Sequence, residues 1–371
     1  MGRSERPGNR LEVMEGHLEG EEKLGKIYKR WEGRPHHTEF EGLIPHATIK
    51  NDNERLAYLK EHRESGQNIP ENRMSRAMEV CLKELVHQHG SLGPADVENS
   101  AEADDEIRGV DFVVIFDQGE DKPPLLLAVD ATCTEHIGYV EEKIGHSLDR
   151  IKKDGSLNEV RYLRSEDHPD LTPQHFMPRI VLGVKSSKGQ EILHDFMDSQ
   201  SKDTDTRRRA NQKLEKGPLT QAVREQAVNQ LAYQLELASQ KLSDDYLSSR
   251  LDTNKNEARK IRELQVLLEP ITRMDDVGQQ IQSEEWAKLV SFLKEPANRQ
   301  IFEQGEQERR STSRALPLVE NIYKILALFE HINKVKEDSP DTTSGGAGQA
   351  TEDDPVGARL GLHRKELLRV Y

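Results

Sequence analysis

The sequence has 371 residues, of which 32% are charged and 34% are hydrophobic, and its formal net charge is -14. Its apolar runs fall far short of the roughly 18 residues that a membrane-spanning helix needs, and its first residues carry charges without a hydrophobic signal segment. We therefore expect no membrane segment and no secretion. The acidity also implies that any binding to nucleic acid depends on a local basic face.

The two cysteines give an expectation for the compartment. Cys81 falls in a predicted helix and Cys133 in a predicted strand, and both positions are apolar. Each is therefore expected to be a small core residue rather than half of a disulfide bridge. That use of cysteine is typical of a reducing environment, so we expect a cytoplasmic protein.

The first half of the chain predicts an α/β domain that follows a polar arm. Residues 1–50 are polar and rich in glycine, and we expect them to be loosely ordered, with the α/β domain over 51–197. A helix is predicted from Pro70 to about residue 90, because apolar residues recur there at helical spacing. Glu79 lies on the flank of that apolar stripe. The acidic stretch 91–106 has the composition of a loop.

Two apolar runs follow, and each carries one embedded carboxylate. The runs 110–116 and 125–133 are rich in β-branched residues and too short for helices, which predicts two buried strands. Asp111 lies in the first strand and Asp130 in the second, where Asp130 and Thr132 share one face. Aspartate is a poor strand former and is costly to bury, so both carboxylates require a partner.

The remainder of this domain is predicted to be a helix over 138–153, strands over 159–163 and 179–184, and a closing helix over 190–197. Lys143 lies beside the inner face of the first of these helices. Its long side chain can reach back toward the edge of the sheet.

The second half of the chain has only helical periodicity. Residues 198–210 have lost their apolar pattern and are predicted to be a linker, and residues 211–337 are predicted to form a helical bundle. This helical region is the predicted contact surface for a protein partner or for a second copy of the chain. Residues 338–371 are predicted to be a disordered tail with a short amphipathic segment at its end.

The paired aspartates have two interpretations, one as a metal site and one as structural residues. Oxygen ligands from Asp111, Asp130 and Glu79 suit Mg²⁺ or Mn²⁺, which offsets charge on a phosphate and makes a bound water more acidic. Two like charges on adjacent strands are also unfavourable unless a cation joins them. The alternative is structural, with Asp111 capping a turn and Asp130 forming a buried ion pair with Arg108, Arg161 or Arg179.

In this order of elements the chain resembles the restriction-endonuclease-like, or PD-(D/E)XK, nuclease superfamily over about residues 70–197. The resemblance rests on Gly109-Val110-Asp111 and on Val129-Asp130-Ala131-Thr132. It implies an α+β fold with a mixed sheet flanked by helices, here followed by an all-α helical region. It also implies action on DNA or RNA, with Asp111, Asp130 and Glu79 as metal ligands.

The family pattern places a lysine two residues after the second acid, and this chain has Thr132 there. Threonine has no positive charge to offer a transition state, so Lys143 is the candidate for the missing role, with Thr132 as its neighbour in the predicted site. Two hypotheses follow. The chain is a divalent-metal nuclease, or it is a non-catalytic nuclease-like scaffold whose helical region and tail bind partners.

Overall fold

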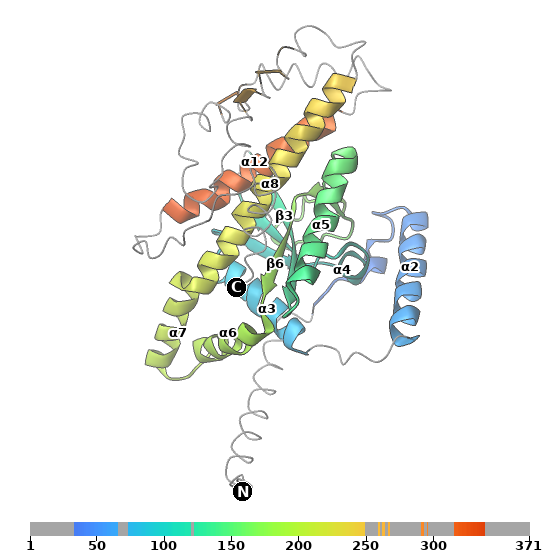
Figure 1. Cartoon of the computed structure of the whole chain (residues 1–371). Helices are drawn as coiled ribbons and strands as arrows, with labels where there is room; N and C mark the ends of the chain where they lie inside the picture. Colours follow the sequence, from blue (N-terminus) through green and yellow to red (C-terminus); the bar gives the residue numbers. More distant parts are fainter. Residues whose placement is uncertain are drawn as a thin grey trace, which may run out of the picture.

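The computed structural model describes residues 33–65, 73–119, 122–248 and 315–337, together with a few isolated positions between 259 and 295 (Figure 1). Most of the predicted N-terminal arm, the middle of the predicted helical bundle and the predicted tail lie outside the described residues. The account below concerns the described part of the chain.

A mixed four-stranded sheet forms the centre of the described structure. Its strands lie in the order β1 (Asp96–Asn99), β2 (Phe112–Phe116), β3 (Leu125–Cys133) and β6 (Arg179–Val184). The β1–β2 and β2–β3 pairs are antiparallel, and the β3–β6 pair is parallel. A parallel pair requires a crossover connection, and the helix α5 (Ile137–Asp154) is its main element. The predicted α+β architecture, a mixed sheet flanked by helices, is thus present.

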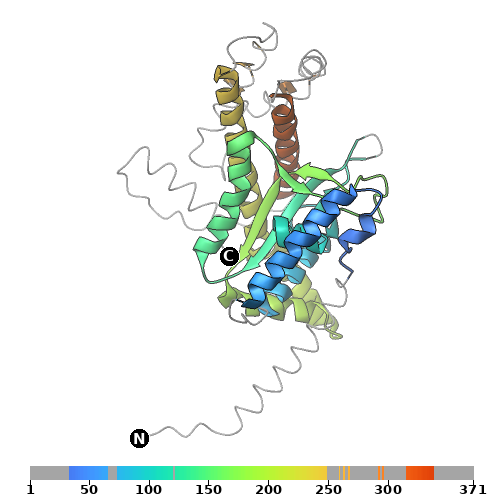
Figure 2. The same ribbon diagram turned by 90° about the vertical axis from the view of Figure 1, so that its right-hand side faces the viewer.

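Alternate residues of the strands pack into two different cores. Phe112, Val114 and Val129 face the larger core, to which the helices α3 (Arg73–His87), α6 (Ser186–Ser199) and α12 (Ala315–Glu337) contribute. Val113, Ile115 and Ala128 face a smaller core under the hairpin of β4 (Asn158–Val160) and β5 (His175–Met177). In Figure 2, α5 (green) lies to the left of the sheet, and α12 (red-brown) lies in the upper part of the view. No helix in the described part of the chain is long and apolar enough to cross a membrane.

Two predictions about connecting segments were wrong. The stretch 91–106, predicted to be a loop, contains β1 and most of the helix α4 (Glu102–Arg108). The strand was missed because it is a short edge strand in which only Val97 is fully buried. The helix was missed because of its acidic composition, although acidic residues in a first turn favour the helix dipole.

The predicted linker 198–210 is also largely helical. α6 ends at Ser199, and α7 (Thr204–Lys216) begins after only four intervening residues. The Asp203 side chain there accepts a hydrogen bond from the backbone N–H of Thr206. An Asp at this position is a favourable N-cap, and it starts a helix that lacks a long apolar stripe.

The described end of the predicted arm is ordered by contacts with the domain. It forms a short 3₁₀ helix, η1 (His37–Phe40), and the start of α2 (His46–Ser65). Phe40 and Ile44 are buried in a small apolar cluster that also contains Tyr162. This segment therefore belongs to the folded body of the protein.

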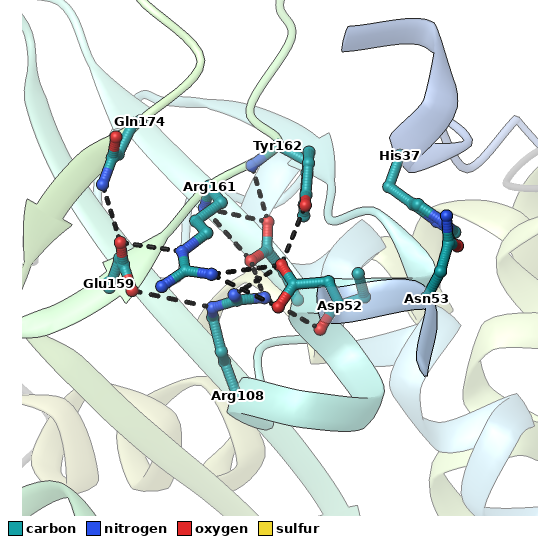
Figure 3. A network of polar contacts seen from close by, with 10 residues as sticks. His37, Asp52, Asn53, Arg108, Glu159, Arg161, Tyr162 and Gln174 are labelled. Carbon is teal, nitrogen blue, oxygen red and sulfur yellow. Dashed lines mark hydrogen bonds and ion pairs between the residues drawn. The ribbon is translucent and has the colours of Figure 1, made fainter. Parts of the chain in front are cut away.

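A buried polar network, drawn in Figure 3, joins α2 to α4 and to the strand β4. Asp52 accepts hydrogen bonds from the Arg108 guanidinium at 2.7 Å and from the Tyr162 hydroxyl at 2.8 Å. Asp104 accepts from Arg108 at 3.1 Å and from the Tyr162 backbone N–H at 2.8 Å. Burial, opposed by Arg108, raises the pKa of Asp104 to about 6. The network fixes α4, which ends three residues before Asp111.

The outer edge of β6 is covered by glutamine side chains of α8 (Pro218–Ser248). Gln230 accepts from the Val181 N–H and donates to the Val181 carbonyl, both at 2.8 Å, and Gln226 makes the same pair of bonds with Gly183. Gln234 donates to the carbonyl of Arg179 at 2.7 Å. Four helical residues rise by about 6 Å and two strand residues by about 6.6 Å, so the two spacings match. The helix thus satisfies the strand edge as another strand would.

Replacing one glutamine of this ladder should leave a backbone N–H and a carbonyl buried without partners. We expect Gln230→Leu to lower the free energy of unfolding by about 2–6 kcal/mol, because it leaves two buried backbone groups unsatisfied at about 1–3 kcal/mol each. Urea unfolding measures this difference. Gln240→Leu, which changes an exposed glutamine of the same helix, is the matched control and should change stability by less than about 0.5 kcal/mol. Equal effects of the two substitutions would show that the ladder does not stabilise the edge.

Candidate functional site

Asp111 and Asp130 lie near each other at one end of the sheet, close enough to interact electrostatically. The antiparallel β2–β3 ladder ends at the pair of Phe112 and Val129, and the two aspartates are the next residues beyond that pair. Two hydrogen bonds hold the main chain of Asp111. Its N–H donates to the Val129 carbonyl at 2.9 Å, and its carbonyl accepts from the Ser100 hydroxyl at 2.9 Å. The Asp111 Oδ2 atom accepts from the Ala131 N–H at 2.6 Å.

Asp130 is held between two cations that come from the elements following β3. Lys143 of α5 donates to Oδ1 at 2.6 Å, and Arg179 at the start of β6 donates to Oδ2. Burial lowers the pKa of Lys143, but the Asp130 carboxylate raises it, and the net shift is upward. Because Asp130 is only 1% exposed, both cations are required to offset its desolvation.

Glu79 occupies a similar position between two cations. Lys83, one helical turn further along α3, donates to Glu79 at 2.7 Å and to the Asn99 side chain at 2.8 Å. Arg34, from the segment before η1, donates to the same carboxylate at 2.6 Å and also pairs with Asp105. Burial raises the pKa of Glu79, but Lys83 and Arg34 lower it, and the net shift is downward.

Asp111 differs from the other acids of the site. Asp130 and Glu79 have cations within hydrogen-bond distance, whereas no cation among the described residues forms an ion pair with Asp111. Burial, and then the carboxylates of Asp105, Asp130 and Glu79, raise its pKa well above the usual range of aspartate. The end of the sheet thus contains a buried carboxyl group that has acidic neighbours and no ion pair of its own among the described residues.

The site residues predicted from the sequence are placed as follows. Asp111, Asp130 and Lys143 come together, and Glu79 is close enough to act on Asp111 electrostatically. Thr132 is buried beside Asp130 on the same face of β3, opposite Gly183, and no hydrogen bond to Asp130 accompanies it. The alternative of a buried ion pair with Arg179 is also realised, so Asp130 has both a lysine and an arginine partner.

Sequence reasoning missed Lys83, Arg34 and Asp105. Lys83 carried a usable signal, because a lysine four residues after a glutamate on a helix forms an ion pair with it. Arg34 carried none, since it lies in the segment predicted to be a loose arm. Asp105 belongs to the stretch that was predicted to be a loop.

We compared the chain with protein-family models, with curated proteins and with solved structures, and none of the three comparisons finds a match. The functional argument therefore depends on the geometry of the site itself.

The donor set was tested against a divalent cation on these observations. The carboxylates of Asp111, Asp130 and Glu79 provide the hard oxygen ligands that Mg²⁺ and Mn²⁺ prefer. Asp111 is the acid of this set without an ion pair to a described cation. No group of three His, Cys, Asp or Glu side chains within the described residues is gathered as a metal cluster, and Glu79 is held by Arg34 and Lys83. The residue types are therefore those that a divalent ion could use, with Asp111 as the acid that has no competing cation.

Asp111→Asn should stabilise the protein in metal-free buffer. The amide keeps an acceptor for the Ala131 N–H and removes a buried charge from among three other acids, so we expect a gain of about 0.5–2 kcal/mol near pH 8. The folded-state pKa of Asp111 is raised, so its carboxyl group costs stability as pH rises above the ordinary aspartate range. The gain should therefore shrink toward about pH 4, which urea unfolding at both pH values measures. Asp170→Asn, at an exposed position, is the control, and a gain that does not depend on pH would contradict this account.

Gly109→Ala should disturb the Arg179 partner of Asp130. Gly109 has φ 66°, and a Cβ atom there would lie 2.7 Å from Arg179 Nη2. We expect a loss of about 1–3 kcal/mol in the free energy of unfolding, from backbone strain and from the displaced guanidinium. Gly145→Ala on α5, where a Cβ atom meets nothing within 4 Å, should instead stabilise by about 0.5–1 kcal/mol. Thermal unfolding of both variants checks these opposite signs.

Proposed function

We propose that this protein is a divalent-metal-dependent nuclease that hydrolyses phosphodiester bonds in DNA or RNA. The observation that carries this proposal is the meeting of Asp111, Asp130 and Lys143 at one end of the sheet, with the lysine supplied by α5. Lys143, on the helix that follows β3, thus provides the positive charge that Thr132 cannot.

The arrangement of elements supports a restriction-endonuclease-like fold. That superfamily, which the sequence resembles, has a mixed sheet flanked by helices and carries its metal-binding acids on the two central strands. Here Asp111 immediately precedes β2 and Asp130 lies within β3, and these are the two central strands of the four. Glu79 comes from α3, the helix that precedes the sheet in the chain.

Mg²⁺ or Mn²⁺, held by Asp111 and Asp130 with help from Glu79, would offset phosphate charge and supply a more acidic water. The chain's own residues have separate tasks. Asp130 orients the Lys143 ammonium, and the raised pKa of Lys143 keeps it charged at neutral pH. A charged ammonium at this position can donate to a phosphate oxygen and stabilise the charge that builds up there.

In the overall reaction a water oxygen forms a bond to phosphorus and the bond from phosphorus to the leaving oxygen breaks. The proton lost by the water is balanced by the proton that the leaving oxygen gains, so the products are a phosphate monoester and an alcohol. Lys143 is a donor close to the acids, and its upward-shifted pKa suits charge stabilisation rather than removal of the proton from water.

The test is cleavage of single-stranded DNA, duplex DNA and RNA in the presence of Mg²⁺ or Mn²⁺. We expect Asp130→Asn and Lys143→Met each to lower the rate by about 100-fold or more, because each removes charge at the reacting centre. Lys152→Met, which removes an exposed lysine from the last turn of α5, should retain activity. Equal rates in wild type and Asp130→Asn, or no cleavage of any substrate, would refute the nuclease proposal.

One observation favours a second candidate, a non-catalytic nuclease-like scaffold. Glu79 and Asp130 each have two cations of the chain within hydrogen-bond distance, so these two acids are already neutralised by the protein. A scaffold of this kind would not need a metal ion.

Metal-induced stabilisation separates the two candidates. A nuclease site should raise the melting temperature as Mg²⁺ or Mn²⁺ is added, since a ligand at 100 times its Kd stabilises the folded state by about 2.7 kcal/mol. This metal-induced shift should vanish in Asp111→Asn. A wild-type protein that melts at the same temperature with and without the ions would favour the scaffold.

A further inference from the structure

A cavity of about 480 Å³ lies beside Asp130, and neither Asp111 nor Glu79 is among the residues that line it. Its walls come from α4, from the ends of β3 and β6, and from α5. The lining residues on which the argument depends are Gly109, Tyr139, Lys143, Arg150, Asn158 and Arg179. The cavity is lined by the buried Asp130 carboxylate, which Lys143 and Arg179 already hold, and by donors that lack such a partner.

Two of these donors are buried and have no acceptor within the described residues. They are the Nδ2 atom of Asn158, whose side chain belongs to a residue only 3% exposed, and the Nε atom of Arg179, a residue 6% exposed. The Arg179 Nη2 atom is used by Asp130, which leaves Nε unpaired. A buried polar group without a partner costs about 1–3 kcal/mol, so this pair of donors points to an acceptor that enters the cavity.

Arg150 adds a positive charge to the same wall. It forms no ion pair with any described residue, and its pKa is lowered by burial and then by the nearby guanidiniums of Arg179 and Arg108. Glu142 and Asp149 also border the cavity, but both are exposed and neither forms an ion pair with Arg150. Arg108 and Arg179 already have the carboxylates of Asp52, Asp104 and Asp130 as partners, so Arg150 is the arginine of this wall that an added anion would pair with.

We propose that this cavity binds the phosphate group of a nucleotide, with Arg150, Arg179 and Asn158 as donors. Phosphate is the anion that matches guanidinium forks in geometry and offers only acceptor oxygens. The volume exceeds that of a bare phosphate and falls within the range of small-molecule sites. Tyr139 on the cavity wall is 49% exposed, so its aromatic ring can stack on a base. The Lys143 ammonium lies 5.1 Å from the centroid of that ring.

The phosphate can belong to a mononucleotide or to the 5′ end of a nucleic-acid strand, since both present the same group. This binding site goes beyond the proposed nuclease and does not depend on it. Binding without metal would stand even if no hydrolysis were found, and hydrolysis without this binding would leave the nuclease proposal intact.

In the experiment the probe is titrated into the full chain in metal-free buffer containing EDTA. Binding is measured by calorimetry, and stabilisation of the protein is measured by thermal melting. The probes are adenosine 5′-monophosphate, adenosine, inorganic phosphate, and one oligonucleotide with and without a 5′-phosphate. We expect the nucleotide or the phosphorylated oligonucleotide to bind and the unphosphorylated counterpart to bind at least 10-fold more weakly. Which of the two phosphorylated probes binds more tightly identifies the source of the phosphate.

Two variants test the residues. Arg150→Gln should weaken binding of the phosphorylated probe by at least 10-fold, whereas Lys153→Gln, which removes an exposed charge from the same helix, should change it by less than 3-fold. Asn158→Asp places a negative charge at the buried donor and should abolish binding in protein whose melting is still cooperative. Adenosine binding as tightly as its 5′-monophosphate, no binding by any phosphorylated probe, or equal effects of the Arg150 and Lys153 substitutions would overturn the proposal.

Discussion

The constraint on which the site depends is the cost of burying a carboxylate in a strand of the central sheet. Asp130 is 1% exposed, and it is tolerated because Lys143 and Arg179 bring two positive charges to it. One cation comes from the crossover helix α5 and the other from β6, the strand that this connection leads into. The parallel β3–β6 pair therefore supplies the charge balance of the site as well as its shape. Removing either cation would leave an uncompensated charge in the interior.

The surrounding structure holds those groups in place by further polar contacts. On one side the network of Asp52, Asp104 and Arg108 fixes α4, and Gly109 then lets the chain pass close to the Arg179 guanidinium. On the other side Gln230 and its neighbours on α8 hold the outer edge of β6. Both supports are buried, so little conformational freedom remains for the strand ends between them. A binding or catalytic site needs rigid supports of this kind to keep its geometry.

The sequence predicted the parts of this arrangement that follow from local pattern. The strands β3 and β6 were found with their bounds because their runs are rich in apolar residues, and the proximity of Asp111 and Asp130 followed from adjacent strands. The edge strand β1 was not found, since one fully buried residue in four leaves no alternation to detect. Arg34 could not be placed, because its contact with Glu79 joins residues 45 apart and no local pattern encodes it. The orphaned donors of the cavity are likewise a product of packing, which a sequence does not display.

Groups without an ion pair or an acceptor remain on two sides of Asp130. On one side Asp111 lies near Asp105 and Glu79, whose partners are Arg34 and Lys83, and on the other side Arg150, Arg179 and Asn158 line the cavity. A structural ion-pair network would gain most by satisfying every group. Here a carboxyl group without an ion pair remains on one side and two unpaired donors remain on the other. A cation on the first side and a phosphate on the second would satisfy both, with Asp130 and Lys143 between them, and that complementarity links the two proposals in one site.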